Sequence, residues 1–277
     1  MKIGKQEFKI GERTYILGIL NVTPDSFYDG GAYYSSGRAI DHARYMIQSG
    51  ADIIDIGGES SRPGSKPITP KEEKERILPI IKQLVQETDV PLSVDTYKAE
   101  VAKAALEAGA SMVNDITALG GDKQMASVVK KFKVPVVLMH MQGTPETMQK
   151  NPKYKNVIKE VSEFLKKRAS FAIRNGIDES NIILDPGIGF GKTTDHNLEI
   201  IANLKEFKKI GYPVLLGPSR KSFIGKILGD LPPEERFEGT LGASAISIFN
   251  DVDFLRVHDV KSTLRVGKVV EAIKKFV

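Results

Sequence analysis

The chain has 277 residues, of which 41% are hydrophobic, so it is long enough to bury a substantial core. Its 40 Lys and Arg against 35 Asp and Glu leave a formal charge of +5, which mildly favours small anionic ligands and is too weak to indicate a nucleic-acid partner. The absence of cysteine excludes disulfides and thiolate metal sites and is consistent with a cytoplasmic protein. Neither a signal-peptide pattern nor an apolar run of membrane-spanning length occurs, so we expect no membrane association.

Short apolar runs rich in Ile, Val and Leu alternate with longer amphipathic stretches, which is typical of buried parallel strands separated by helices. We expect a small β-hairpin within Met1–Arg13, covering the bottom of the barrel. The predicted strands are Tyr15–Val22, Asp52–Gly57, Leu92–Asp95, Met112–Ile116, Val134–His140, Ile182–Asp185, Val214–Leu216 and Phe254–His258. Eight strand and helix units predict an α/β fold, a (β/α)8 TIM barrel formed by residues 1–277 as one domain. A doubly wound open sheet is the alternative, because sequence alone does not show closure.

The boundaries between helices and strands carry their own signals. A glycine just before the next strand suits the left-handed position after a helix, and this pattern occurs at Gly50, Gly109, Gly176 and Gly211. The segment Gln142–Lys155 contains two prolines and predicts a loop. A long charged helix should follow it and end near Arg174.

Polar residues gather where nearly every predicted strand ends. In a parallel barrel these ends meet at one face, where active sites assemble from several strands. Two carboxylates, an amide and a lysine there would suit a planar, nitrogen-rich ring, and these residues are Asp95, Asn114, Asp185 and Lys221. Each alone has a simpler explanation, such as a helix cap for Asp95 or a turn for Asn114, so it is their combination that favours a site.

A second group at the same ends contains cations and an amide but no carboxylate, as an anion site requires. Its members are Asn21, Arg62, Arg256 and His258. A diphosphate is the natural ligand, because the planar fork of arginine binds phosphate oxygens in pairs and a protonated imidazole adds charge. The alternative is that both arginines pair with neighbouring acids and that His258 is structural.

The segment Gly187–Thr193 ends in Gly-Lys-Thr and superficially resembles a nucleotide-binding loop. Its spacing fails, because the first glycine of that loop would fall on Pro186 and the third glycine of the dinucleotide fingerprint on Lys192. We interpret its glycines as allowing a tight turn and close backbone approach to a ligand. No sequence pattern indicates a protein metal cage. A hydrated Mg2+ carried by a diphosphate and contacted by Asn21 would need fewer protein ligands.

Long motifs follow the strands in order across almost the whole chain: Asn21–Phe27, Glu59–Gly64, Ser93–Thr96, Val113–Asp115, His140–Pro145, Asp185–Thr193, Gly217–Phe223 and Arg256–Val260. Together they closely resemble the dihydropteroate synthases of folate biosynthesis. The resemblance implies a TIM barrel, commonly a homodimer, that joins a hydroxymethyl-dihydropterin diphosphate to 4-aminobenzoate and releases pyrophosphate. Two positions depart from the commonest motifs: Ser61 stands where threonine is usual, and Tyr28 where a small residue is frequent.

The resemblance also implies roles for individual residues. The pterin would bind to Asp95, Asn114, Asp185 and Lys221, with Met139 and Arg256 along its faces. The diphosphate and its Mg2+ would lie with Asn21, Arg256 and His258. The aminobenzoate site would comprise Phe27, Ser61, Arg62, Pro63, Phe190, Lys221 and Ser222. Catalysis would depend on Asp95, Lys221, Arg256 and His258.

These roles fit a dissociative substitution. Breaking the carbon–oxygen bond beside the pterin leaves a methylene cation, which the ring delocalises and which Asp95 would stabilise electrostatically. Mg2+, Arg256 and His258 would assist departure of the diphosphate. The arylamine is a competent nucleophile without a strong base. Closure of the loops Asn21–Tyr34 and Glu59–Pro67 would keep water away from the cation.

Two other functions share part of this pattern. A pterin-barrel methyltransferase that serves a corrinoid protein would keep the ring-binding acids. It would not need the anion features of Gly217–Phe223 and Arg256–Val260, nor the Asn21–Phe27 loop. A non-catalytic pterin-binding or storage protein would leave the lid loops and the cation cluster unexplained.

Overall fold

Strands and helices alternate along the chain in the computed structural model, which describes residues 1–23, 32–62 and 64–277, with the backbone alone for 32–36. The strands are β1 Lys2–Ile3, β2 Gln6–Glu7, β3 Tyr15–Asn21, β4 Ile53–Gly57, β5 Leu92–Asp95, β6 Met112–Asp115, β7 Val136–Met139, β8 Ile182–Asp185, β9 Leu215–Leu216 and β10 Phe254–Val257. The helices are α1 Ala32–Gln48, α2 Pro70–Glu87, α3 Ala99–Glu107, α4 Met125–Phe132, α5 Val157–Arg174, α6 Thr194–Ala202, α7 Leu204–Lys208, α8 Ser222–Ile227, α9 Phe237–Phe249 and α10 Val260–Lys274. Strands β3 to β10 each fall within a predicted range.

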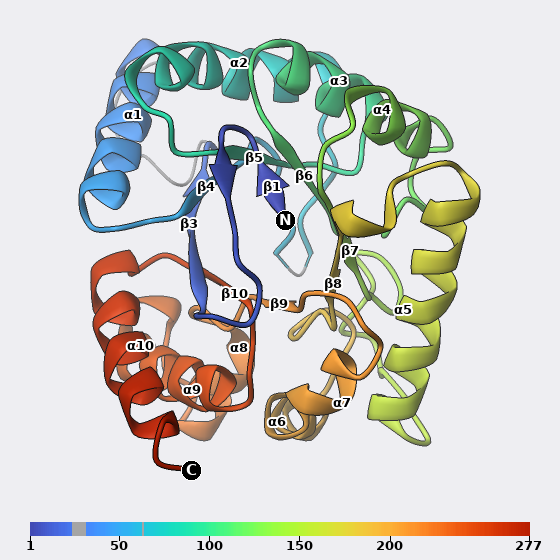
Figure 1. Cartoon of the computed structure of the whole chain (residues 1–277), viewed down its shortest axis with the longest axis vertical. Coiled ribbons are helices and arrows are strands. Elements are labelled where there is room, and N and C mark those ends of the chain that lie inside the picture. The colour runs from blue at the N-terminus through green and yellow to red at the C-terminus, as the bar shows by residue number, and fades with distance from the viewer. Residues whose placement is uncertain (24–31, 63) are drawn as a thin grey trace.

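Strands β3 to β10 form a parallel sheet surrounded by helices (Figure 1). Hydrogen-bonded neighbours follow the order β8-β7-β6-β5-β4-β3-β10-β9. A parallel bridge between Leu184 of β8 and Val214, the residue before β9, joins the two edges of that sheet. The sheet is therefore a barrel, which confirms the TIM-barrel prediction and excludes the open sheet.

The interior of the barrel is apolar at its amino end. Side chains from the first half of the strands form one buried cluster with the hairpin segment: Ile3, Phe8, Tyr15, Leu17, Ile53, Met112, Val137, Ile183, Leu215 and Phe254. The ring of Tyr15 packs between those of Phe8 and Phe254, with centroids 4.8 and 5.6 Å away. The hairpin β1–β2 lies across the centre of the barrel in Figure 1, which confirms the predicted cover.

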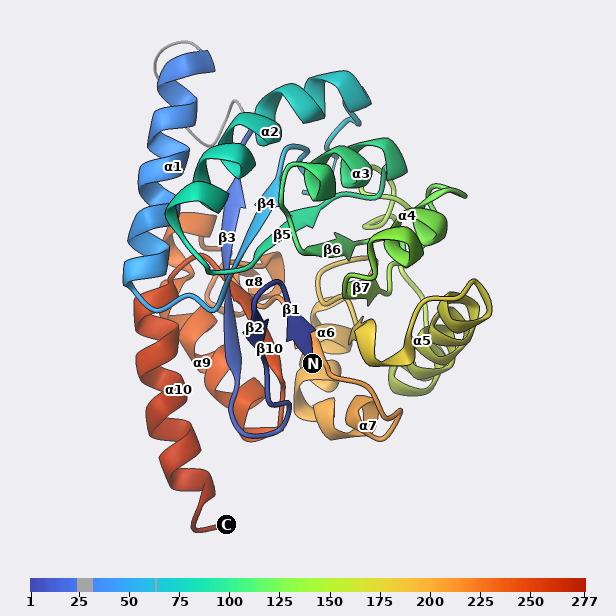
Figure 2. The ribbon, with the colours of Figure 1, turned by 45° about the horizontal axis from the view of Figure 1, so that its top comes forward.

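Each predicted helix end is also present. Gly50, Gly109, Gly176 and Gly211 all have positive φ angles, between 83° and 113°, as the left-handed position after a helix requires. Helix α5 follows the predicted loop and ends at Arg174. Figure 2 shows that the helices pack around the outside of the strands, where a second and larger apolar cluster fills the space between the two layers.

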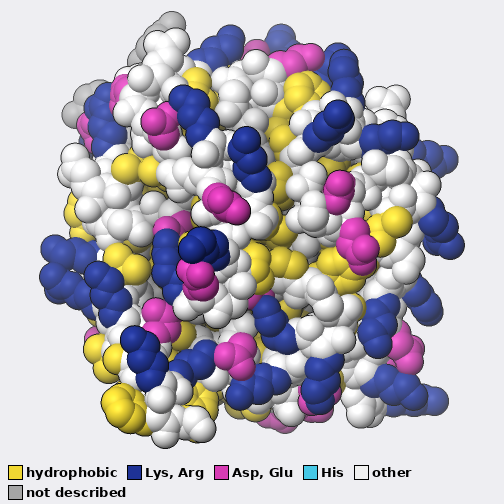
Figure 3. All heavy atoms as spheres, in the orientation of Figure 1, with side chains coloured by type: hydrophobic (Ala, Val, Ile, Leu, Met, Phe, Trp, Pro, Cys, Tyr) yellow, Lys and Arg dark blue, Asp and Glu magenta, His cyan; other side chains and the backbone are white. Residues whose placement is uncertain are grey.

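The surface at the hairpin end carries charges of both signs. Lys and Arg side chains lie around this face with Asp and Glu between them, so no continuous basic patch forms there (Figure 3). Among the described residues, none of the helices combines the length and the hydropathy that crossing a bilayer requires.

Candidate active site

The carboxyl ends of the strands place polar side chains inside the barrel. Side chains alternate along a strand, so a residue two positions after an inward-facing one also faces inward. The apolar layer at the amino end is therefore followed by a second inward layer, made of Asp55, Asp95, Asn114, Met139, Asp185 and Arg256. The strand register agrees, because Asp95 lies beside Asn114 and Met139 beside Asp185.

Arg256 of β10 joins two carboxylates in this layer. Its Nε donates to Oδ2 of Asp55 at 2.5 Å, and its Nη2 donates to Oδ2 of Asp95 at 2.6 Å. The amide of Asn114 donates to the same oxygen of Asp55 at 3.0 Å. Asp55 is fully buried, and its Oδ1 has no hydrogen-bond partner among the described residues. These hydrogen bonds fix the orientation of the Arg256 and Asn114 side chains.

Asp95 is held in a state close to its titration point. Burial raises the pKa of its carboxyl to about 7; the charge of Arg256 opposes this shift and that of Asp55 adds to it. For Arg256, burial lowers the pKa, but the carboxylates of Asp55 and Asp95 outweigh it and raise the pKa overall. The guanidinium is therefore a permanent cation, and a nearby positive charge would favour the ionised form of Asp95.

A second pair, one acid and one base, comes from the last residue of β8 and from the loop after β9. Asp185 accepts a hydrogen bond from the N–H of Gly187 at 2.7 Å, and burial raises the pKa of its carboxyl to about 6. Burial, followed by the charge of Arg256, lowers the pKa of Lys221 to about 8. The Lys221 ammonium lies 4.1 Å from the centre of the Phe190 ring. Near neutral pH this pair offers both a donor and an acceptor to a ring.

His258 lies just beyond β10, and its Nδ1 is 2.9 Å from Oγ of Ser219. Burial, followed by the charge of Arg256, lowers the pKa of its imidazole to about 3. The imidazole is therefore neutral at pH 7 in this structure, whereas the sequence left open a protonated form. An anion bound beside it would favour protonation. Arg62 is among the charges that act on His258, which places the exposed loop after β4 near this histidine.

The two predicted anion-binding arginines have different surroundings. Arg256 pairs with acids, as the alternative interpretation held, but its Nη1 makes no hydrogen bond within the described part of the chain. Arg62 is exposed and forms no ion pair with any described residue. Asn21, at the end of β3, is half-buried and pairs in register with Gly57. The described residues contain no group of three or more His, Cys, Asp or Glu placed to hold a metal.

The predicted aminobenzoate residues come from several loops. Ser61 and Arg62 follow β4, and Ser222 opens α8 and is exposed. Phe190 is buried beneath Lys221. The remaining two, Phe27 and Pro63, lie outside the described residues, as does Tyr28. The structure therefore brings Phe190 next to Lys221, the residue directly before Ser222, and Ser61 lies on the separate loop after β4.

An apolar wall borders the polar layer. Met139 packs with Ile116, Met148 and Phe190 in a small cluster that is separate from the main core. A cavity of about 470 Å³ opens beside Met139, and its lining includes Ile116 and Tyr97. A flat ring that bonds to the acids of the inner layer would meet this wall with one face.

Three residues of this region escaped the sequence analysis as participants. Asp55 interrupts an otherwise apolar strand, and that interruption is a signal that it faces a polar interior. Lys192 and His140 were seen only as parts of motifs, yet both are buried and lie 2.9 Å apart. No spacing in the sequence links these two residues.

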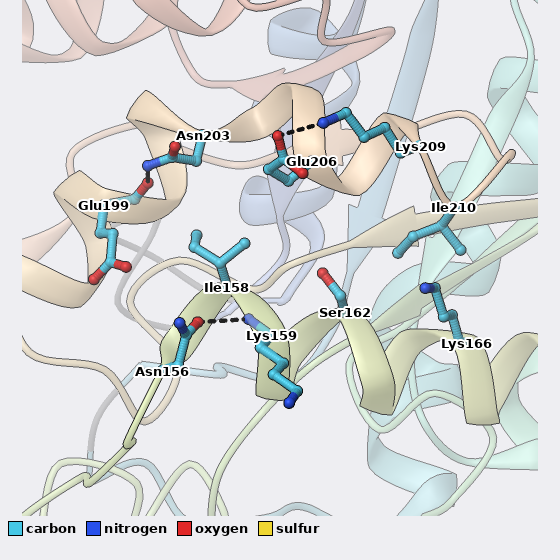
Figure 4. A pocket seen from close by; sticks show the side chains of 10 residues that line it. All are labelled: Asn156, Ile158, Lys159, Ser162, Lys166, Glu199, Asn203, Glu206, Lys209 and Ile210. Carbon is cyan, nitrogen blue, oxygen red and sulfur yellow. Dashed lines mark hydrogen bonds and ion pairs between the residues drawn. The ribbon is translucent and has the colours of Figure 1, made fainter.

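A groove of about 480 Å³ lies on the outer surface, where α5 faces the helices α6 and α7 (Figure 4). Its charged side chains have both signs, and Lys209 is paired with Glu206 at 2.7 Å. It has no convergent set of donors and acceptors comparable to that inside the barrel. The carboxyl end of the barrel is therefore the candidate active site.

Comparison with known proteins identifies the family of the chain. Residues 17–258 match the family of pterin binding enzymes. The dihydropteroate synthase of Clostridium beijerinckii is 51% identical, over 99% of both chains. A Clostridium difficile dihydropteroate synthase, solved in the presence of pteroic acid, has a TM-score of 0.91 and 47% identity, covering 96% of this chain and 99% of that one. A Xanthomonas albilineans dihydropteroate synthase with 4-aminobenzoic acid has a TM-score of 0.90 and 42% identity, covering 95% and 94% of the two chains. The chain thus belongs to the pterin binding enzymes and, among them, to the dihydropteroate synthases.

Proposed function

We propose that the chain joins 6-hydroxymethyl-7,8-dihydropterin diphosphate to 4-aminobenzoate by dissociative substitution at the pterin methylene, giving 7,8-dihydropteroate and pyrophosphate. One observation carries this proposal: Arg256 connects the set of ring-binding groups to the set of cations at the same end of the barrel. A ligand with a flat head and an anionic tail fits such a site. The pteroic acid and aminobenzoic acid named for two relatives support the same substrates.

The pterin head would lie on the inner polar layer. Asp95, Asn114, Asp185 and Lys221 would hydrogen-bond its edge, since a pterin carries both donors and acceptors. Met139 would contact one face and Arg256 the other. Burial of Asp95 and Asp185 fits this role, because the N–H groups of a bound pterin would supply hydrogen bonds to carboxyl groups that are shielded from water.

The diphosphate would lie toward Arg62, Arg256 and His258, with the amide oxygen of Asn21 reaching its Mg2+. An amide oxygen is a hard ligand of the kind that Mg2+ prefers. Because its neighbours are cationic, the ion would be held chiefly by the phosphate oxygens of the substrate. Bound Mg2+ would neutralise charge that develops on the leaving group. His258, neutral in this structure, would donate a hydrogen bond and gain a proton more readily beside the anion.

The reaction itself needs few protein groups. The carbon–oxygen bond breaks, its electron pair leaves with the pyrophosphate, and a methylene cation remains conjugated to the pterin. Ionised Asp95 would stabilise that cation at close range. The aminobenzoate nitrogen then forms the new carbon–nitrogen bond and loses a proton. Phe190, with Lys221, Ser61, Arg62 and Ser222, would hold the arylamine, together with Phe27 and Pro63.

The remaining expectations concern the molecule as a whole. We infer that residues 1–277 act as one pterin-binding unit, in the cytoplasm, without nucleic-acid or membrane partners. We also infer a homodimer, because α9 and α10 pack together and expose large apolar side chains: Ile246, Phe249, Val269 and Ile273. Light scattering coupled to gel filtration tests the dimer, and Val269→Glu should weaken it.

A direct assay distinguishes this function from its rivals. The purified chain, given the pterin diphosphate, aminobenzoate and Mg2+, should release pyrophosphate and dihydropteroate in equal amounts. Chelation of Mg2+ should weaken binding of the diphosphate substrate, and added Mg2+ should restore it. Pterin binding without any product would favour a storage protein. Methyl transfer from methyltetrahydrofolate to a corrinoid protein would favour the methyltransferase.

A further inference from the structure

Lys192 is a buried cation for which the proposed chemistry has no use. It stands in the Gly-Lys-Thr sequence whose spacing is wrong for a phosphate-binding loop, and it is 2% exposed. Burying an ammonium is costly unless its N–H groups find acceptors. The position of this lysine therefore requires a specific explanation.

The ammonium of Lys192 is fully engaged by the protein. It donates to the carbonyl oxygen of Gly187 at 2.8 Å and to that of Phe190 at 3.1 Å. Its third short contact is Nδ1 of His140 at 2.9 Å, with a longer contact of 3.4 Å to the carbonyl oxygen of the same residue. Burial lowers the pKa of this amine to about 7, and the carboxylate of Asp185 opposes the shift. In its protonated form the amine has three N–H groups for three short contacts, with Nδ1 of His140 as the acceptor.

These contacts join the loop after β7 to the loop after β8. A Cβ atom added to Gly187 would overlap the carbonyl oxygen of His140, and one added to Gly191 would overlap that of Gln142. Tyr154 contributes another connection, because its hydroxyl donates to the Gly191 carbonyl at 2.9 Å. The two backbones approach this closely because the second loop has glycine at both points.

The loop held by Lys192 carries groups of the candidate site. Gly187 bonds to Lys192 through its carbonyl and to Asp185 through its N–H, at 2.7 Å. Phe190 bonds to Lys192 through its carbonyl, while its ring lies beneath the ammonium of Lys221. Lys192 thus fixes the backbone at Gly187 and at Phe190, and each of these residues also contacts a residue of the candidate site.

We propose that Lys192 is a positioning residue, which holds the Gly187–Phe190 turn against His140 so that Asp185 and Phe190 are correctly placed for the two substrates. The lysine binds the carbonyl oxygens of its own loop, whereas the lysine of a nucleotide-binding loop binds phosphate. This inference rests on the proposed function, because it assumes that Asp185 and Phe190 contact pterin and aminobenzoate.

Lys192→Met tests the proposal, since methionine keeps most of the side-chain volume and removes the donors. The pterin dissociation constant, measured by calorimetry, should rise about tenfold or more, as the loss of hydrogen bonds to a charged group predicts. The KM for aminobenzoate should also rise, while kcat falls less. Lys192→Arg retains the charge and the donors and should recover part of the affinity.

Lys208→Met is the matched control. This lysine is also partly buried and paired, but its partner is Asp253, next to the amino end of β10. The control should lower the melting temperature and leave the pterin dissociation constant unchanged. An unchanged constant in Lys192→Met, or an equal rise in the Lys208→Met control, would overturn the proposal.

Two further measurements keep the proposal testable if Lys192→Met does not fold. Tyr154→Phe removes one connection between the same loops without removing a charge, and it should raise the pterin dissociation constant several-fold. If Tyr154→Phe leaves substrate affinity unchanged, the proposal is wrong. Failure of the unaltered chain to bind pterin would instead disprove the site itself, and with it this inference.

Discussion

The two ends of the barrel are built from the same strands but have opposite properties. Along β4, Ile53 belongs to the apolar layer under the hairpin, and Asp55, two residues later, pairs with a guanidinium. Along β10, Phe254 packs on Tyr15, and Arg256, two residues later, connects two acids. The residues that stabilise the fold and the residues of the candidate site are therefore only two positions apart on the same strands. This is the division expected between the bottom and the top of a TIM barrel.

The difference has an energetic side. Burial at the amino end removes apolar surface from water and stabilises the fold. Burial at the carboxyl end raises the pKa of Asp95 and Asp185 and leaves one oxygen of Asp55 without a partner among the described residues. Such groups are unfavourable for stability and are retained where a ligand uses them.

Phe254→Ala should produce the largest effect on stability. Deleting a large buried aromatic side chain leaves a cavity and typically costs about 3–5 kcal/mol. Denaturant unfolding monitored by circular dichroism measures the loss. Well below the midpoint, the folded fraction should keep the KM values of the unaltered chain. Altered KM values would show that the two ends are coupled more tightly than their separation implies.

Asp95→Asn should have the complementary effect at the other end. Because the carboxylate would stabilise the methylene cation, we expect kcat to fall about 100-fold to 1000-fold, as for the loss of one preorganised electrostatic contact. Pterin affinity should change much less, since the amide keeps a hydrogen-bonding group. Steady-state kinetics and calorimetry give the two values. Equal losses in kcat and in affinity would make Asp95 a binding residue only.

His258→Ala should have a smaller effect, confined to the anionic tail of the substrate. The loss of one hydrogen bond to a charged group predicts about a tenfold weaker binding of the pterin diphosphate. The pterin alcohol that lacks the diphosphate is the matched ligand, and its affinity should not change. If both ligands lose affinity to the same extent, His258 does not belong to the diphosphate site.

Asp95 should also produce a pH dependence that has opposite signs for stability and activity. Burial raises the pKa of Asp95 from 3.8 to about 7, so the folded chain holds its proton more tightly than the unfolded chain. The resulting stabilisation is complete below pH 3.8 and is lost as the pH rises through about 7. Activity needs the ionised form, so kcat/KM should rise over the same range. Asp95→Asn should reduce both pH dependences. If kcat/KM of this variant still rises with pH as in the unaltered chain, the titrating group belongs to the substrate.

The sequence was most informative about periodic features. Apolar runs predicted strands β3 to β10, and glycines such as Gly109 marked helix ends, because both depend on local backbone and burial preferences. It also indicated Asp95 and Asn114, which stand at the ends of these runs. It did not single out Lys192, because the function of that residue depends on carbonyl oxygens brought together by two loops.

Sequence alone determined that residues two positions apart on a strand share a face, since alternation along a strand is a property of the backbone. The closed barrel decided what they meet there: Arg256 reaches Asp55 across 201 positions of sequence, and their contact exists because β10 and β4 flank the same strand. The protonation of His258 was likewise decided by its surroundings, because burial and neighbouring cations, not the residue type, lower its pKa to about 3.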